Sequence, residues 1–128
     1  AGVNATINDM GVWVRAHLGA FPQVLSRAML AEIHGPVVES PTRNYFNRWE
    51  GMESAHYGTG WRVFDMFGTR VVHHGGGVRG YRSEMALIPE EDIGMVLMIN
   101  AESNIINEVV PLFVKHILSV KSGQEQKP

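Results

Sequence analysis

The architecture of this chain is set by residues 60–100, whose sequence is GWRVFDMFGTRVVHHGGGVRGYRSEMALIPEEDIGMVLMIN. Apolar and β-branched runs alternate in it with short turn segments, which is the pattern of consecutive strands. We expect strands over residues 60–67 and 70–74 on either side of a Gly68-Thr69 turn, and a further strand over residues 80–88. The short connections predict an antiparallel meander.

Residues 93–100 form an almost unbroken apolar run. A strand that is apolar on both faces is normally covered on both faces. We therefore expect a central strand with helices above and below it. The Pro89-Glu90-Glu91-Asp92 segment is a charged turn that leads into this strand.

Two short helices are expected before the strands. Thr6 is a suitable N-cap for the first, whose apolar residues recur at helical spacing until Gly19. The second is expected from Ser26 to about His34. Residues 37–56 are polar and irregular, and we expect a long surface loop there.

The last helix is expected over about residues 104–120. Pro111 implies that this helix either kinks or begins near Val110 with the proline in its first turn. Residues 121–128 are polar and predict a disordered tail. The sequence thus predicts one α+β domain over residues 1–120, with an antiparallel sheet of about four strands flanked by helices.

Composition narrows the class of protein. Hydrophobic residues make up 45% and charged residues 19% of the 128 residues, which is typical of a folded globular domain. The net charge of −2 gives no basic surface for nucleic acid, and no apolar run approaches the ~20 residues of a membrane span. The absence of cysteine excludes disulfides and thiolate metal sites. No signal peptide opens the sequence, so any export signal is expected upstream of Ala1.

The glycine-rich segment His73 to Tyr81 is the densest candidate site. Gly75, Gly77 and Gly80 match the spacing of the dinucleotide-binding fingerprint. That fingerprint requires a helix after the glycines, whereas this sequence predicts a strand, so nucleotide binding is disfavoured.

Three other interpretations of this segment remain. His56, His73 and His74 could bind a metal, but adjacent histidines on a strand point to opposite faces, and we expect no metal. A substrate pocket would use the close backbone approach that glycine allows, with His74 as the polar side chain beside it. The structural alternative is that the glycines only mark a bulge or a tight crossing.

The order of several short motifs resembles the C-terminal part of the serine β-lactamase family, which includes class C-like β-lactamases, penicillin-binding proteins and esterases. The motifs are Tyr57-Gly58-Thr59-Gly60-Trp61, His74-Gly75-Gly76, Gly80-Tyr81, Ile88-Pro89-Glu90 and the strand that ends at Asn100. The similarity extends over about residues 2–120. It implies that this chain is a fragment of a β-lactamase-like domain, whose N-terminal part is the missing partner.

The resemblance also implies roles for single residues. His74, Gly75 and Gly76 match the family's third motif, Lys-Thr-Gly or His-x-Gly, on the strand that lines the pocket. Gly77 matches the position whose backbone N–H forms half of the oxyanion hole, where a fixed donor contributes ~3 kcal/mol. His74 and Gly77 are therefore the catalytic candidates. Gly75 and Gly76, together with Asn100 at its strand end and Arg79 in its loop, are the substrate-binding candidates.

Two departures bear on the substrate. His74 stands where other members have lysine, and a histidine loses its charge above pH ~6.5. Gly75 replaces a hydroxyl residue that contacts the substrate carboxylate. β-Lactams, peptidoglycan stem peptides and small esters therefore all remain candidate substrates.

The family's nucleophile motif, Ser-x-x-Lys, does not occur in this sequence, because none of the seven serines has a lysine three residues later. Tyr45-Phe46-Asn47 matches the second motif, Tyr-x-Asn, in letters only, since that motif precedes this segment in the family. We expect the parent to be an exported, periplasmic or secreted serine hydrolase without a cofactor. This chain alone is expected to be inactive and to form homo-oligomers. The alternative is a non-catalytic binding module derived from that family.

Overall fold

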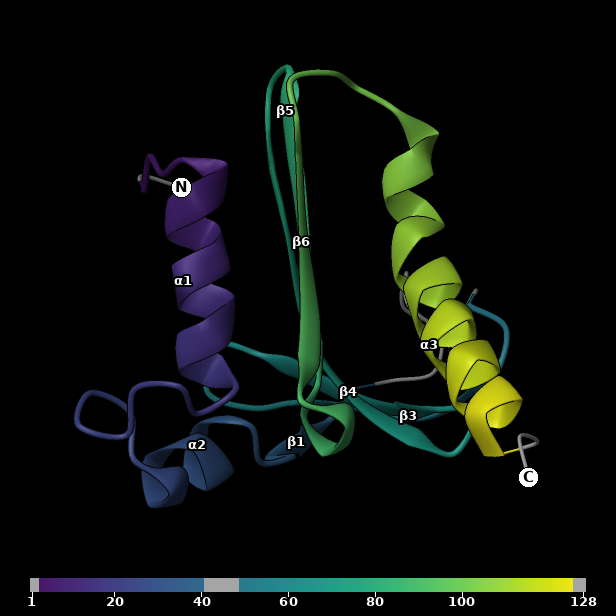
Figure 1. Cartoon of the computed structure of the whole chain (residues 1–128). Coiled ribbons are helices and arrows are strands. Elements are labelled where there is room, and N and C mark those ends of the chain that lie inside the picture. Colours follow the sequence, from purple (N-terminus) through teal and green to yellow (C-terminus); the bar gives the residue numbers. More distant parts are fainter. Residues whose placement is uncertain (1–2, 41–48, 126–128) are drawn as a thin grey trace.

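The computed structural model describes residues 3–40 and 49–125. In that part the chain forms one six-stranded antiparallel sheet with three α-helices (Figure 1). In chain order the elements are α1 (Ile7–His17), α2 (Arg27–Ile33), β1 (Val38–Glu39), β2 (Met52–Tyr57), β3 (Arg62–Met66), β4 (Thr69–Val78), β5 (Tyr81–Ile88), η2 (Pro89–Glu91), β6 (Ile93–Ile99), η3 (Asn104–Asn107) and α3 (Val109–Glu125). The α+β class is confirmed, with six strands instead of about four.

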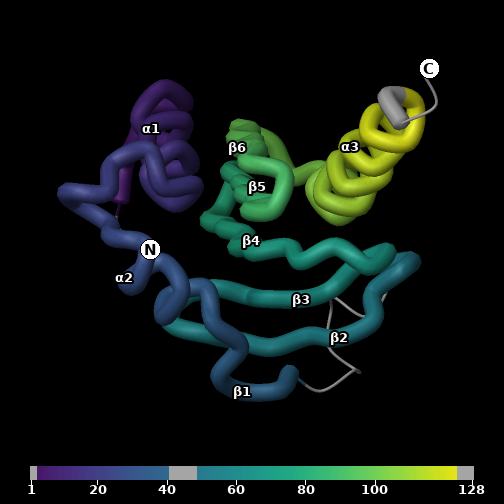
Figure 2. Tube along the Cα trace, turned by 60° about the horizontal axis from the view of Figure 1, so that its bottom comes forward, coloured from purple at the N-terminus to yellow at the C-terminus, as the bar shows by residue number. Residues whose placement is uncertain are grey.

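The strands neighbour one another in sequence order, from β1 at one edge to β6 at the other. In Figure 1 the β5–β6 end of the sheet stands between α1 and α3. Figure 2 shows β4, β3, β2 and β1 following below that end as the sheet turns away. The helices therefore cover opposite faces of the β5–β6 end.

The expected loop over residues 37–56 is wrong in part, because β1 and most of β2 lie in it. β2 escapes pattern analysis because its register shifts between Met52 and Ser54, which breaks the alternation of side chains. It is also held by polar contacts, since Ser54 Oγ donates a 2.8 Å hydrogen bond to Asp65 of β3. The Tyr45-Phe46-Asn47 match lies outside the described residues.

The prediction for β6 is half confirmed. Ile93 and Met95 pack against the cluster that contains α3, and Val96 packs against the cluster that contains α1, so both faces are covered. The central position is wrong, because β6 is the edge strand of the sheet in the described part of the chain. Apolar residues on both faces of a strand indicate that other elements cover both faces. They do not indicate whether a further strand pairs with its edge.

Two clusters of buried side chains form the core, one on each face of the sheet. On the α3 face the cluster combines strand residues such as Phe64 and Val71 with Val110 and Val114 of α3. On the α1 face it combines Val14 of α1 with Trp61, Val63, Val72, Met85 and Leu87. Because adjacent strand residues point to opposite faces, these clusters fix the direction of every side chain in β4.

Several local predictions are confirmed. Thr6 and Asp9 form a capping box at the start of α1, and Ser26 caps α2. Pro111 lies in the first turn of α3, as the second alternative required. The β3–β4 turn is centred on Phe67 and Gly68, with φ values of 51° and 73°, one residue earlier than expected.

The disordered tail is wrong over residues 121–125, because α3 continues to Glu125. Residues 122–125 carry no proline, and the side chains of Lys121 and Glu91 form a 2.6 Å ion pair that ties this end to the β5–β6 turn. A polar composition alone does not end a helix that is already nucleated. In the described ranges, no helix combines the length and apolar character that crossing a membrane requires.

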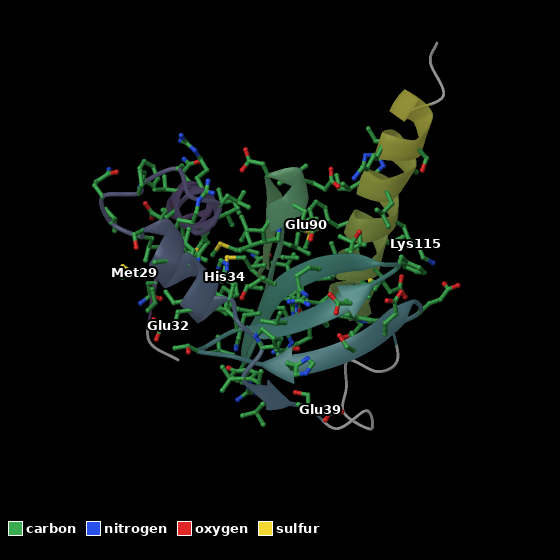
Figure 3. The ribbon with its side chains drawn as sticks, turned by 90° about the horizontal axis from the view of Figure 1, so that it is seen from below. Met29, Glu32, His34, Glu39, Glu90 and Lys115 are labelled. Carbon is green, nitrogen blue, oxygen red and sulfur yellow. The ribbon has the colours of Figure 1, made fainter. Side chains whose placement is uncertain are left out.

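A histidine pair joins the first two helices. His17 Nδ1 of α1 lies 2.9 Å from Nε2 of His34, which follows α2. In Figure 3, His34 lies at the end of α2 nearer the sheet. The His17 ring packs against Trp13 at 4.5 Å and Trp61 at 4.7 Å between ring centroids, and His17 is only 3% exposed. Burial, and secondarily the neighbouring His34, lowers the pKa of His17 to about 4.

Candidate active-site strand

The glycine-rich segment forms the outer half of β4 and its turn into β5. His74 lies opposite Met85, whose side chain belongs to the α1-face cluster, whereas His73 lies opposite Ala86 of the α3-face cluster. The two histidines therefore point to opposite faces, as expected, and His56 lies on β2. No group of three or more potential metal ligands occurs in the described residues.

His74 is held by two hydrogen bonds. Its Nδ1 lies 2.7 Å from the carbonyl oxygen of Gly75, and a carbonyl only accepts, so Nδ1 carries the proton. In the neutral ring Nε2 is then an acceptor, and it receives the hydroxyl proton of Tyr57 over 3.1 Å. Tyr57, on β2, was not predicted as a site residue, although it opens the Tyr57-Gly58-Thr59-Gly60-Trp61 motif.

Side chains of the neighbouring strand lie close over the three glycines, and a Cβ at any of them would require the end of one of these side chains to shift. A Cβ on Gly75 would lie 2.6 Å from Glu84 Oε1, one on Gly76 2.5 Å from Ser83 Oγ, and one on Gly77 2.6 Å from an Arg82 side-chain nitrogen. Each of these β5 residues is the direct cross-strand partner of its glycine. The structural interpretation of the glycines therefore has direct support. It leaves the role of the backbone N–H groups open.

The other edge of β4 is open beside this segment. Pairing with β3 ends at Arg62 opposite His73, and in the described part of the chain no strand pairs with residues 74–78 on that side. Gly76 and Gly77 are exposed. The backbone at the predicted oxyanion position is thus accessible to a ligand, and the assignment of Gly77 N–H stays a prediction.

Asn100 and Arg79 lie near the far end of the same strand. Asn100 follows Ile99, which is opposite Arg82 on β5, and Arg79 lies in the β4–β5 turn; both are exposed. At ~3.3 Å per residue, three residues of β4 place His74 ~10 Å along the strand from Gly77. The predicted site residues therefore follow one strand and its tip, and no contact between His74 and Asn100 or Arg79 is seen.

Glu102 anchors this tip and was also missed. It accepts a 3.1 Å hydrogen bond from Gly80 N–H and forms a 2.5 Å ion pair with Arg82. The chain after β6 is thereby tied to the β4–β5 turn. No sequence pattern identifies this contact, because 22 residues separate Gly80 from Glu102.

The dinucleotide interpretation is excluded by the local fold. The residue after Gly80 begins strand β5, and no helix follows the glycines. The N-terminal end of a helix, which supplies the phosphate-binding N–H groups in that motif, is therefore missing from this position.

A family model described as Beta-lactamase matches residues 1–108. The chain belongs to the β-lactamase family. The roles expected from the resemblance for His74 and the glycines after it stay predictions.

Two individual proteins are similar to this β-lactamase-family chain. Unguisins hydrolase ungD' from Aspergillus campestris (strain IBT 28561) is 30% identical over 96 residues, which are 75% of this chain and 17% of that protein. The octameric penicillin-binding protein homologue from Pyrococcus abyssi has a similar structure, with a TM-score of 0.68 and 21% identity over 87% of this chain and 24% of that one. The second likeness supports the fold alone. The chain spans about a sixth of the curated relative's length and about a quarter of the structural neighbour's.

Proposed function

We propose that this chain supplies the third-motif strand of a serine hydrolase that works through an acyl-enzyme. The observation that carries the proposal is the open edge of β4 beside exposed Gly76 and Gly77, in a chain of the β-lactamase family. A backbone N–H on such an edge is held by the strand before substrate arrives, so it stabilises a developing oxyanion without reorganising. In this proposal Gly77 is that donor.

The nucleophile would come from outside these 128 residues. Acyl transfer requires a serine within hydrogen-bond reach of its base, and none of the seven serines here belongs to a Ser-x-x-Lys motif. The missing serine and lysine would approach the α1 face, because His74 points to that face. This chain alone would then be inactive.

His74 and Gly75 bear on the substrate class. A neutral His74 that accepts from Tyr57 offers no fixed positive charge to a substrate carboxylate, and Gly75 offers no hydroxyl. These features favour peptides or esters over efficient hydrolysis of carboxylate-bearing β-lactams. The relative named unguisins hydrolase is consistent with hydrolysis. We also propose export to the periplasm or the medium, which cell fractionation of the full-length protein would test.

The decisive experiment compares the full-length protein with residues 1–128. Both are incubated with a fluorescent penicillin, a chromogenic β-lactam and an activated ester. We expect covalent labelling or ester turnover by the full-length protein and neither by the 128-residue chain. Stoichiometric labelling of a serine within residues 1–128 would refute the missing nucleophile. No labelling or turnover by the full-length protein would favour the non-catalytic module.

A further inference from the structure

A buried histidine–glutamate pair lies on the face of β4 opposite His74, and burial lowers the pKa of His73. His73 Nε2 contacts Glu84 Oε2, and the two residues are 0% and 7% exposed. The rings of Trp49 and Phe64 lie edge-on to His73, with centroids at 5.4 and 6.0 Å, and Arg62 is its direct cross-strand neighbour on β3. A polar side chain in such a place is costly to bury unless it is hydrogen-bonded, as His73 and Glu84 are to each other. An apolar pair, like the residues elsewhere on this face, would serve the core at least as well.

The Glu84 carboxylate also lies over the glycine segment. Glu84 is directly opposite Gly75, and its side chain extends across the strand to reach His73, two residues before Gly75. In doing so Oε1 occupies the position 2.6 Å from where a Gly75 Cβ would be. The carboxylate therefore packs on the backbone of Gly75 from the α3 face.

The pair lies at the point along β4 where pairing with β3 ends. β3 pairs with β4 over residues 69–73 and β5 pairs with it over residues 72–78, so His73 is the last residue with a partner strand on both sides. From His74 to Val78 only β5 pairs with it in the part of the chain that the structure describes. Glycines in this half have no side chains of their own to fix the backbone, so its position depends on what β5 places against it.

We propose that Glu84, held by His73, is a positioning residue that fixes the backbone of residues 75–77 and thereby aims the Gly77 N–H at the substrate oxyanion. This inference rests on the proposed function. The mechanism is steric and polar: His73 anchors the carboxylate, and the carboxylate limits movement of Gly75 toward the α3 face. Neither residue touches the substrate, since the pair lies on the face away from His74.

The test uses four variants of the full-length protein: Glu84→Ala, Glu84→Gln, Gly75→Ala and the double variant Gly75→Ala/Glu84→Ala. Glu90→Gln, at an exposed glutamate in the β5–β6 turn that Figure 3 labels, is the matched control. The readouts are kcat and KM for an activated ester, the melting temperature, and hydrogen–deuterium exchange of a peptide that covers residues 74–78.

We expect Glu84→Ala to lower kcat about 10- to 100-fold with KM changed less than about threefold, because a displaced oxyanion donor acts on the transition state. Glu84→Gln keeps the size and an acceptor oxygen, so it should recover most of kcat. Gly75→Ala should lower kcat in the native background and have a much smaller effect once Glu84 is alanine. Exchange over residues 74–78 should rise in Glu84→Ala and stay unchanged in Glu90→Gln.

The inference is overturned if Glu84→Ala lowers kcat no more than Glu90→Gln does. It is equally overturned if the loss of kcat in the double variant equals the product of the losses in Gly75→Ala and Glu84→Ala. It is also overturned if Glu84→Gln loses as much kcat as Glu84→Ala. Exchange separates this failure from failure of the proposed function, because it needs no turnover. An inactive full-length protein whose residues 74–78 loosen selectively in Glu84→Ala refutes the hydrolase and retains the positioning role. Unchanged exchange refutes the positioning role.

Discussion

Acid should destabilise the docking of α1 and α2 through the pair formed by His17 and His34. The two facing ring nitrogens are 2.9 Å apart, so one must accept while the other donates. When both rings are protonated, both nitrogens carry hydrogens and the contact becomes repulsive. The pKa of His17 falls from 6.5 to about 4 through burial first and His34 second, and burial also lowers the pKa of His34.

The sign and size of this pH effect on the free energy of unfolding follow from the difference in proton binding between the folded and unfolded chain. Between pH 6.5 and 4 the unfolded chain binds a proton at His17 that the folded chain does not, so the free energy of unfolding decreases as the pH falls through this window. Above pH 6.5 His17 has no effect. Each pH unit inside the window costs about 1.4 kcal/mol, so at pH 5 the loss from His17 is about 2 kcal/mol.

Urea unfolding followed by tryptophan fluorescence at pH 7 and pH 5 measures this effect, and Trp13 and Trp61 both contact the His17 ring. In the variant His17→Gln, the difference in unfolding free energy between the two pH values should shrink by about 2 kcal/mol. His116→Gln, at an exposed position on α3, is the control and should retain the native difference. An unchanged pH dependence in His17→Gln would refute the argument.

The remaining predictions concern the site and the assembly. In the full-length protein, His74→Lys should raise kcat/KM at pH 8 for carboxylate-bearing β-lactams relative to neutral esters, since it adds a charge that histidine lacks there; an unchanged ratio would show that residue 74 does not face the substrate. Tyr57→Phe removes the 3.1 Å hydrogen bond to His74 and should lower kcat/KM severalfold with a melting temperature within a few degrees of the native one; no loss of activity would exclude an orienting role for Tyr57. The 128-residue chain should form dimers or larger oligomers, because the outer edge of β6 pairs with no described strand and Met98 of β6 is 41% exposed. Covering ~400 Å² of apolar surface would favour association by ~10 kcal/mol before the entropy costs of association. Light scattering after size exclusion at micromolar concentration measures this, and a monodisperse 14.2 kDa species that binds no hydrophobic dye would contradict it.

Most of the local structure could be predicted from short-range signals. The capping box at Thr6, the cap at Ser26 and the place of Pro111 each depend on residues within one helical turn, and all three are confirmed. The alternation over residues 80–88 likewise predicted β5 within one residue. The family was recognisable because its motifs occur in order along the chain, and the family match over residues 1–108 confirms it.

The failures share a cause, which is dependence on residues distant in sequence. β2 is a strand because β3 pairs with it across a shifted register, and no alternation in its own residues announces this. The candidate site shows the same limit. Tyr57 reaches His74 across 17 residues, and Glu84 reaches His73 across 11, and neither pairing has a local signature.

The sequence by itself therefore determined that strands occupy most of residues 60–99 and that β6 is covered on both faces, since side-chain periodicity encodes which groups must leave water. Only the tertiary structure decided that β6 is an edge strand in the described chain and that Glu84 packs on Gly75. It also decided that, among the described strands, none pairs with the β3-side edge of β4 from His74 onward. Periodicity specifies the face toward which a side chain points, whereas the neighbour at a strand's edge is chosen by backbone hydrogen bonds that every residue except proline can make alike.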